Sequence, residues 1–306
     1  MAVSGTAFAQ SSVSLTGKLR FAYGTAKAVD GAKTTGVGVT DGDWNIAAVE
    51  DLGGGLKAGA NMALRLRGRD AATDGTSTGV GARPRDSSMY LTGGFGTVTV
   101  GAIEAGNGIL GLVTAGGPTY IGLDNGVQLA GASNVDILQY TSPAMNGFSF
   151  KAATLDAVGG GGSQNGGALT VYGANYANGP VSAALDVTKY GSSFAATANS
   201  RTRISANYNL GVAIVGAGYQ NADNGAAAAK KETAISVSAP FGAFNVGAVY
   251  ATSKTDGTPG NNTGYDLSAQ YNLSKRTYVA LQAQSTKAAG ATASATNTRV
   301  QLAHSF

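Results

Sequence analysis

Residues 56–67, LKAGANMALRLR, alternate between two kinds of side chain along their whole length. The apolar set is Leu56, Ala58, Ala60, Met62, Leu64 and Leu66, and the other set is Lys57, Gly59, Asn61, Ala63, Arg65 and Arg67. A period of two is typical of a β-strand with one apolar and one polar face. The stretch is long enough to cross a bilayer as a tilted strand. It therefore predicts a membrane strand that turns its purely apolar face to lipid.

The first regular stretch, VSLTGKLRFAYG at 13–24, follows the same pattern. Val13, Leu15, Leu19, Phe21 and Tyr23 share one face, and the alternate positions include Lys18 and Arg20. Lys18 and Arg20 are therefore expected on the polar face, away from lipid.

Composition narrows the fold class. Only 12% of the residues are charged, about half of the roughly 25% typical of soluble domains. Yet the mean hydropathy is +0.01, and no stretch approaches the ~18 consecutive apolar residues of a transmembrane helix. A closed β-barrel satisfies all backbone groups within a membrane and averages to such a hydropathy, so we expect an all-β transmembrane barrel.

The alternating stretches number sixteen, which is an even number, as expected for an antiparallel barrel. A barrel of about 16 strands is too wide for its own side chains to fill and encloses water. Short turns such as GGFG and SPAMNG join the strands at one end, and longer polar connections join them at the other. The expected strands are 13–24, 43–50, 55–68, 86–93, 96–102, 134–141, 147–156, 168–177, 181–190, 201–208, 212–220, 231–239, 243–253, 263–272, 276–286 and 296–306.

One gap in this series is far longer than a usual connection. Residues 102–133 form a loop of about thirty residues, against a typical four to six. The loop is rich in apolar residues and poor in charge, so it needs a surface to pack against. We expect this third long loop to fold into the lumen and to set the width of a pore.

Several other classes of protein are disfavoured. The chain has no Cys, and its single His, His304, lies on a face of the last strand expected to meet lipid, without a Ser/His/acid group nearby. The glycine run at 159–162 lacks the pattern of a nucleotide-binding loop. The net charge of +4 is dispersed, with no basic run typical of nucleic-acid binding. We therefore expect no catalytic site, metal, cofactor or nucleic-acid partner.

The N-terminus differs from the rest. Ala7-Phe8-Ala9 fits the small-x-small pattern of a signal-peptidase site, although no positive n-region precedes it. Residues 1–9 are interpreted as the tail of an export signal, with residues 10–306 forming a single barrel. A loose terminus remains the alternative.

Alternation also selects the charges expected on the lumen face. Positions near the middle of a strand matter most, because salt screens charges over a Debye length of about 8 Å. The primary basic candidates are Lys18, Arg20, Arg65, Arg83 and Arg85, with Arg67 and Arg203 secondary. Glu104 and Asp124, in or beside the long loop, are the acidic candidates. Opposed charges would orient polar solutes, and the excess of bases predicts a modest preference for anions. Any one of these residues could instead be a solvated wall charge or a turn residue.

Six segments in order resemble the general diffusion porins of Gram-negative outer membranes, most closely the β-proteobacterial type. They are SSVSLTGKLRFAYG, EDLGGGLKAG, LTGGFGTVTVG, QYTSPAMNGFSF, YNLSKRTYVALQAQ and the terminal LAHSF. The resemblance implies a 16-stranded antiparallel barrel, a homotrimer, and a third loop whose acidic side opposes a ladder of basic wall residues. Lys18, Arg83 and Arg85 match positions of that ladder. Two positions where the family often has arginine are Asp43 and Gln139 here, which weakens the expected preference for anions.

The function expected from these observations is passive diffusion of small hydrophilic solutes and ions through a water-filled channel in the outer membrane. Three alternatives remain open. One is a channel specific for sugars or organic anions, and another is a structural or adhesive barrel plugged by its own loop. An outer-membrane enzyme is the third and has the least support.

Overall fold

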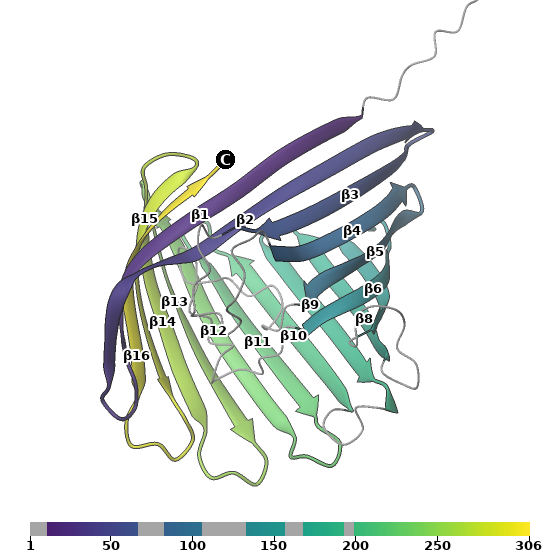
Figure 1. Ribbon diagram of the computed structural model, residues 1–306. Coiled ribbons are helices and arrows are strands. Elements are labelled where there is room, and N and C mark those ends of the chain that lie inside the picture. Colours follow the sequence, from purple (N-terminus) through teal and green to yellow (C-terminus); the bar gives the residue numbers. More distant parts are fainter. Residues whose placement is uncertain (1–10, 67–82, 106–132, 157–167, 193–198) are drawn as a thin grey trace, which may run out of the picture.

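The computed structural model describes residues 11–66, 83–105, 133–156, 168–192 and 199–306. Within these residues sixteen antiparallel strands form one closed barrel, in which each strand pairs with its chain neighbours and β1 pairs with β16 (Figure 1). The predicted all-β barrel of sixteen strands is confirmed. Residues 106–132, most of the predicted inward loop, lie outside the described residues, as do residues 1–10. No helix in the described ranges is long and apolar enough to cross a membrane.

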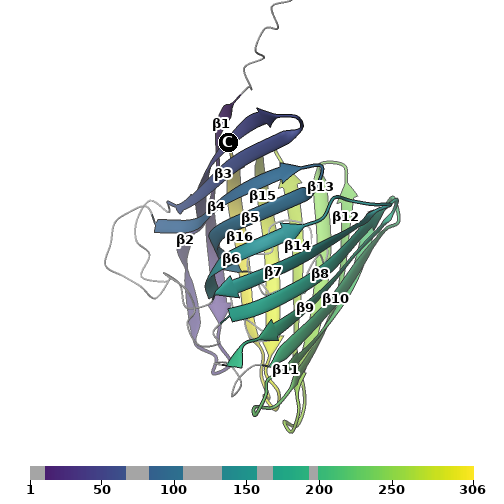
Figure 2. The ribbon, with the colours of Figure 1, turned by 90° about the vertical axis from the view of Figure 1, so that its right-hand side faces the viewer.

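The strands follow the expected series closely. Their bounds are β1 (Ser12–Lys27), β2 (Lys33–Gly53), β3 (Leu56–Arg65), β4 (Arg83–Gly93), β5 (Gly96–Ala105), β6 (Ser133–Thr141), β7 (Phe148–Asp156), β8 (Ala168–Asn178), β9 (Val181–Tyr190), β10 (Ser200–Asn209), β11 (Ile214–Asp223), β12 (Lys230–Phe241), β13 (Phe244–Thr255), β14 (Asn262–Asn272), β15 (Thr277–Lys287) and β16 (Ala295–Ser305). Figure 2 shows β3 to β8 side by side in chain order.

Several strands differ from their expected limits by a few residues, and two of these differences affect charged residues of the lumen face. The stretch 33–42, interpreted from sequence as a Gly/Thr/Asp-rich loop, belongs to the 21-residue strand β2. It is a strand because β1 continues to Lys27 and pairs with it down to Lys33. Likewise, Arg83 and Arg85, expected just ahead of the fourth strand, lie inside β4. In both cases a neighbouring strand supplies hydrogen bonds that local composition does not reveal.

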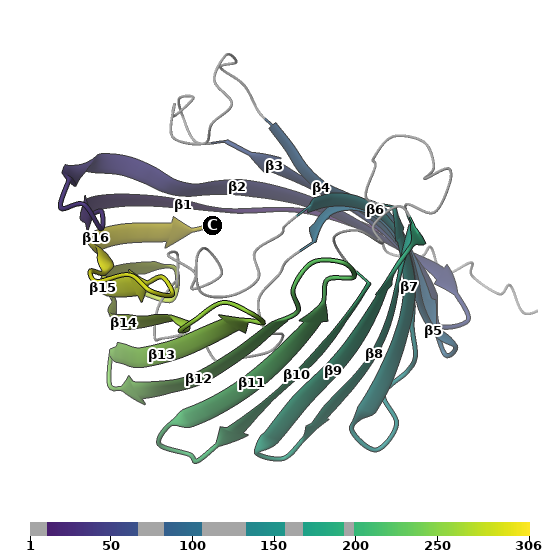
Figure 3. The same cartoon turned by 90° about the horizontal axis from the view of Figure 1, so that it is seen from below.

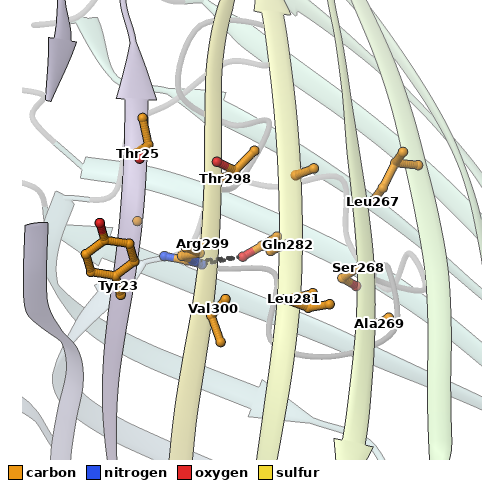
Figure 4. A pocket seen from close by; sticks show the side chains of 12 residues that line it. Tyr23, Thr25, Leu267, Ser268, Ala269, Leu281, Gln282, Thr298, Arg299 and Val300 are labelled. Atoms are coloured by element: carbon orange, nitrogen blue, oxygen red, sulfur yellow. Dashed lines mark hydrogen bonds between the residues drawn. The ribbon is translucent and has the colours of Figure 1, made fainter. Parts of the chain in front are cut away.

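The two faces of the wall differ as the alternation predicts. Large apolar side chains are exposed on the outer face, including Val13, Phe21, Met62, Met89, Phe150, Tyr172, Ile204 and Leu302. Polar side chains are buried on the inner face, including Arg20, Asp41, Asp186, Arg203, Gln220, Glu232 and Gln301. Figure 4 shows this division on β14–β16, where apolar Leu281 and Val300 flank Gln282 and Arg299. Arg299 Nε and Nη2 donate to Gln282 Oε1 at 2.8 and 2.5 Å, which joins β16 to β15.

Short turns close the end of the barrel at which β1 begins and β16 ends. In the turn after Pro143, Asn146 and Gly147 both adopt positive φ, 51° and 87°. Those values suit the mirror-image turns that match the twist of a hairpin, and Asn-Gly is their preferred sequence.

At the same end the terminal residue completes the barrel. The Gly17 amide donates to the Phe306 carbonyl at 3.0 Å, and the Phe306 amide donates to the Gly17 carbonyl at 2.9 Å. The ring of Phe306 lies over Gly17 and meets Trp44 edge-on, with ring centroids 4.9 Å apart. A Cβ at position 17 would approach the Phe306 ring to less than 3.0 Å. Because Gly17 has no side chain, the Phe306 ring can pack directly over it.

We expect Gly17→Val to displace the Phe306 ring and to lower the stability of the folded barrel by about 1–3 kcal/mol, as overpacking commonly does. Trp44 is the only tryptophan in the sequence, so its emission reports directly on this contact. Tryptophan fluorescence during urea unfolding in detergent measures both effects. Gly36→Val is the matched control, because a Cβ at position 36 has nothing within 4 Å. Equal midpoints for the two variants would contradict the prediction.

Candidate functional site

The inner face of β1–β4 gathers six charged side chains, which we call the charged cluster. Strand β1 supplies two basic members and β2 supplies two acidic members, while β3 and β4 each supply one basic member. The cluster consists of Lys18, Arg20, Asp41, Asp43, Arg65 and Arg85.

Asp41 anchors the more deeply buried half of the cluster. Its side chain is only 2% exposed. Lys18 Nζ lies 2.7 Å from Asp41 Oδ2, and Arg20 donates to the same oxygen through Nε at 3.1 Å and also through Nη2. A carboxylate so deeply buried needs charged donors to offset the loss of water, and these two residues provide them.

Asp43 organises the half nearer the open lumen. Arg85 Nη1 donates to Asp43 Oδ2 at 2.5 Å, while Lys18 Nζ lies 3.7 Å from that oxygen. Arg65 Nε lies 3.7 Å from Asp43 Oδ1. One carboxylate thus faces three cations from three different strands, and all three cationic side chains are 29–42% exposed.

A β-bulge in β2 lies directly beside Asp41. Arg20 pairs with Asp41 but the next residue, Phe21, pairs with Val39, so Thr40 is an additional residue in β2. Asp41 and Asp43 alternate regularly and share the lumen face with their partners Arg20 and Lys18. Cross-strand partners share a face, and Phe21 faces outward, so the bulge turns Val39 to the outer face. Bulges commonly re-aim a side chain in this way.

A second bulge, in β4, turns Arg85 toward the lumen. Met62 pairs with Ser87 and Leu64 pairs with Pro84, so Arg85 and Asp86 both stand opposite Ala63. Strict alternation from Met89, which is 63% exposed on the outer face, would place Arg85 on that face as well. The extra residue turns Arg85 inward, to Asp43. One local irregularity, the bulge in β4, therefore adds Arg85 to a cluster whose other members follow regular alternation.

The cluster carries more positive than negative charge. Four cations face two carboxylates, and Asp86 Oδ2 lies 3.7 Å from Arg85 Nε, so an excess of one positive charge remains when Asp86 is counted as well. The cationic side chains of the cluster that are partly exposed are those of Lys18, Arg65 and Arg85. The cluster therefore presents a positive field to the lumen, with Asp43 placed at its centre.

The other predicted residues have different positions. Arg83 pairs through its backbone with Arg65, and Glu104 pairs through its backbone with Asn134 near the end of β5. Arg67 and Asp124 lie outside the described residues. Gln139 lies on the inner face of β6, where its Nε2 donates to Thr141 Oγ1 at 3.2 Å.

Arg203 lies on the opposite wall, away from the charged cluster. In a closed barrel of sixteen strands, β10 is half-way round from β2, and Figure 3 shows β9–β12 facing β1 and β2 across the lumen. Arg203 is buried, and its Nε donates to Gln220 Oε1.

Sequence reasoning missed one central residue, Asp41. It lies in the stretch interpreted as a loop, although alternation extended back from Asp43 places it on the lumen face. The signal was present in TDGDWN, where Asp41 and Asp43 are two residues apart and immediately precede the recognisable strand. Within the described residues, no group of three or more His, Cys, Asp or Glu side chains could hold a metal ion.

Comparisons with known proteins agree with this architecture. A family model described as Gram-negative porin matches residues 1–291. Outer membrane porin protein 32 of Delftia acidovorans is 30% identical over 251 residues, which cover 70% of this chain and 64% of that relative. The matched region thus spans slightly less than two thirds of that relative's length.

Solved structures show the same fold at low sequence identity. A loop-deletion mutant of OmpT, an outer membrane protein of Vibrio cholerae, has a TM-score of 0.69 and 14% identity, covering 97% of this chain and 99% of that one. A triple mutant of the Rhodopseudomonas blastica porin has a TM-score of 0.69 and 17% identity, covering 96% and 100%. Together with the match over most of its length, these similarities show that the chain belongs to the Gram-negative porin family.

Proposed function

We propose that this porin forms a water-filled outer-membrane channel for passive diffusion of small hydrophilic solutes and ions, with a modest preference for anions. The observation that carries the proposal is the charged cluster, in which four cations and two carboxylates face the lumen of a closed sixteen-stranded barrel. Fixed charges on the wall of an aqueous pore attract counter-ions and raise their local concentration.

The proposal includes finer features that rest on sequence. Residues 102–133 narrow the lumen opposite the basic wall, and Glu104 and Asp124 supply the acidic side. The chain assembles as a homotrimer and reaches the outer membrane by means of an export signal that ends near residue 9. Support for these features comes from the composition of the loop, the Ala7-Phe8-Ala9 pattern and membership of the family.

Single-channel recording across a planar bilayer tests the main proposal. The purified, refolded protein is added under a KCl gradient, and conductance and reversal potential are measured together. We expect open steps in groups of three and a reversal potential that favours chloride. Absence of conductance from correctly folded protein would favour a plugged, structural barrel. Saturable conduction that one class of solute blocks would favour a substrate-specific channel.

The constriction has its own test. Replacing residues 106–132 with a short Gly/Ser linker is expected to raise single-channel conductance about twofold or more, because the narrowest ring controls conduction. The matched control shortens 157–167, another long connection on the same end of the barrel. Unchanged conductance in the first variant would refute a constriction made by this segment.

A further inference from the structure

A second row of charged and polar side chains crosses the inner wall of β7–β12. Its members are successive register partners on neighbouring strands, so they follow the hydrogen-bonding direction around the barrel. In order they are Lys151, Gly173, Asp186, Arg203, Gln220 and Glu232. Two positive and two negative charges make the row neutral as a whole.

The row is linked by side-chain contacts along its length. Arg203 Nε donates to Gln220 Oε1, and Gln220 Nε2 donates to Glu232 Oε2. Lys151 Nζ lies 2.8 Å from Asp186 Oδ1, although these residues are on β7 and β9, which do not pair with each other. The ion pair between Lys151 and Asp186 therefore crosses over β8.

Gly173 makes this crossing possible. It is the residue of β8 that lies between Lys151 and Asp186 in the register. A Cβ at position 173 would come within 3.0 Å of Asp186 Oδ1 and of Lys151 Cε. Both atoms are near the ends of flexible side chains, whereas no backbone atom is among the nearest contacts. A larger residue would thus push the ion pair apart and leave the sheet in place.

The ion pair between Lys151 and Asp186 determines which charge is exposed to the lumen at this point. The Lys151 side chain is 23% exposed, while that of Asp186 is 8% exposed, so the ammonium is the more accessible partner. While the pair is closed, an adjacent carboxylate balances the ammonium. If the pair opens, Lys151 becomes an uncompensated cation on the lumen wall, whereas Asp186 keeps Arg203 as its neighbour in the register.

We propose that Gly173 is a specificity-determining position of the pore. By allowing Lys151 and Asp186 to pair across β8, it removes one lumen-facing ammonium from the charges that attract anions, and so limits the anion preference. Gly173 acts through Lys151 and is a positioning residue. The inference rests on the proposed diffusion-channel function.

The test uses a variant that alters no charge. Gly173→Val keeps every titratable group and suits a strand, yet it separates the pair. We expect the chloride-to-potassium permeability ratio, measured from the reversal potential, to rise by up to about twofold, because the Lys151 ammonium moves nearer to the path of the ions while Asp186 stays buried in the wall. Gly173→Ala already introduces the Cβ and should shift the ratio in the same direction, which provides a second variant if valine hinders folding.

A double-mutant cycle separates this role from a structural one. Lys151→Gln should reduce the ratio more strongly in the Gly173→Val background than in the wild type, because only there is the ammonium uncompensated. Equal effects in both backgrounds, or an unchanged reversal potential in both glycine variants, would overturn the inference. If Asp43→Asn still shifts the reversal potential in that case, the channel function stands. If the wild type does not conduct, the proposed function itself fails.

Discussion

Replacing Asp43 with asparagine is expected to raise the chloride-to-potassium permeability ratio about threefold. Asp43 faces Lys18, Arg65 and Arg85, all of which extend partly into the lumen. Its carboxylate is therefore the acidic group that most directly offsets the exposed positive charge. Asparagine has nearly the same shape and retains an oxygen to accept the hydrogen bond from Arg85, so the wall should keep its geometry.

The size of the effect follows from distance and screening. A unit charge acting on an ion about 6 Å away in water contributes about 0.7 kcal/mol, which corresponds to a factor of about three in local concentration. The Debye length at physiological ionic strength is about 8 Å, so the effect should shrink as the salt concentration of the assay rises. Reversal potentials measured at two mean KCl concentrations check the magnitude and its dependence on salt.

Asp256→Asn is the matched control. It makes the same chemical change at a residue whose side chain is 49% exposed in the connection after β13, paired only loosely with Lys231 at 3.7 Å. Charges at the mouth of a pore are screened by salt, so the control should leave the reversal potential unchanged. A similar shift in both variants would show that overall charge, and not the charged cluster, sets selectivity.

Much of the fold could be predicted because the strands of a membrane barrel alternate apolar and polar residues along the sequence. The alternation of Leu56 to Arg65 and of Val13 to Tyr23 separates a lipid face from a lumen face, and each strand repeats that rule. Lys18 and Arg20 lie on the polar face for this reason, and both contact Asp41. The number of strands follows once each alternating stretch is bounded by turns.

The details of the charged cluster could not be predicted from alternation alone. The bulges at Thr40 and at Arg85–Asp86 reverse the parity of the residues beyond them, and nothing in the local sequence marks either one. Asp41 was hidden for another reason, because the stretch 33–42 joins β2 only through its pairing with β1. The pairing of Lys151 with Asp186 is equally hidden, since it depends on a glycine from a third strand being brought between them by the register.

The second large effect is expected from removing two arginines together. Arg65→Gln with Arg85→Gln should lower the chloride-to-potassium ratio about tenfold, since each unit charge contributes a factor of about three. The cluster would retain Lys18 and Arg20 against Asp41 and Asp43, and the neighbouring Asp86 would leave one net negative charge. Arg20 and Asp41 are buried against each other, so the charges accessible to ions would be those of Lys18, Asp43 and Asp86. We therefore expect the sign of the reversal potential to change.

The control for that variant keeps the charge and alters the shape. Arg65→Lys with Arg85→Lys preserves two cations but loses the planar guanidinium groups, so it should retain the preference for anions even if the contact with Asp43 weakens. Loss of selectivity in both double variants would mean that guanidinium geometry, and not charge, is decisive. If the glutamine variant still favours chloride, the selective charges lie elsewhere on the wall, and Arg203 on the opposite side of the lumen becomes the next residue to replace.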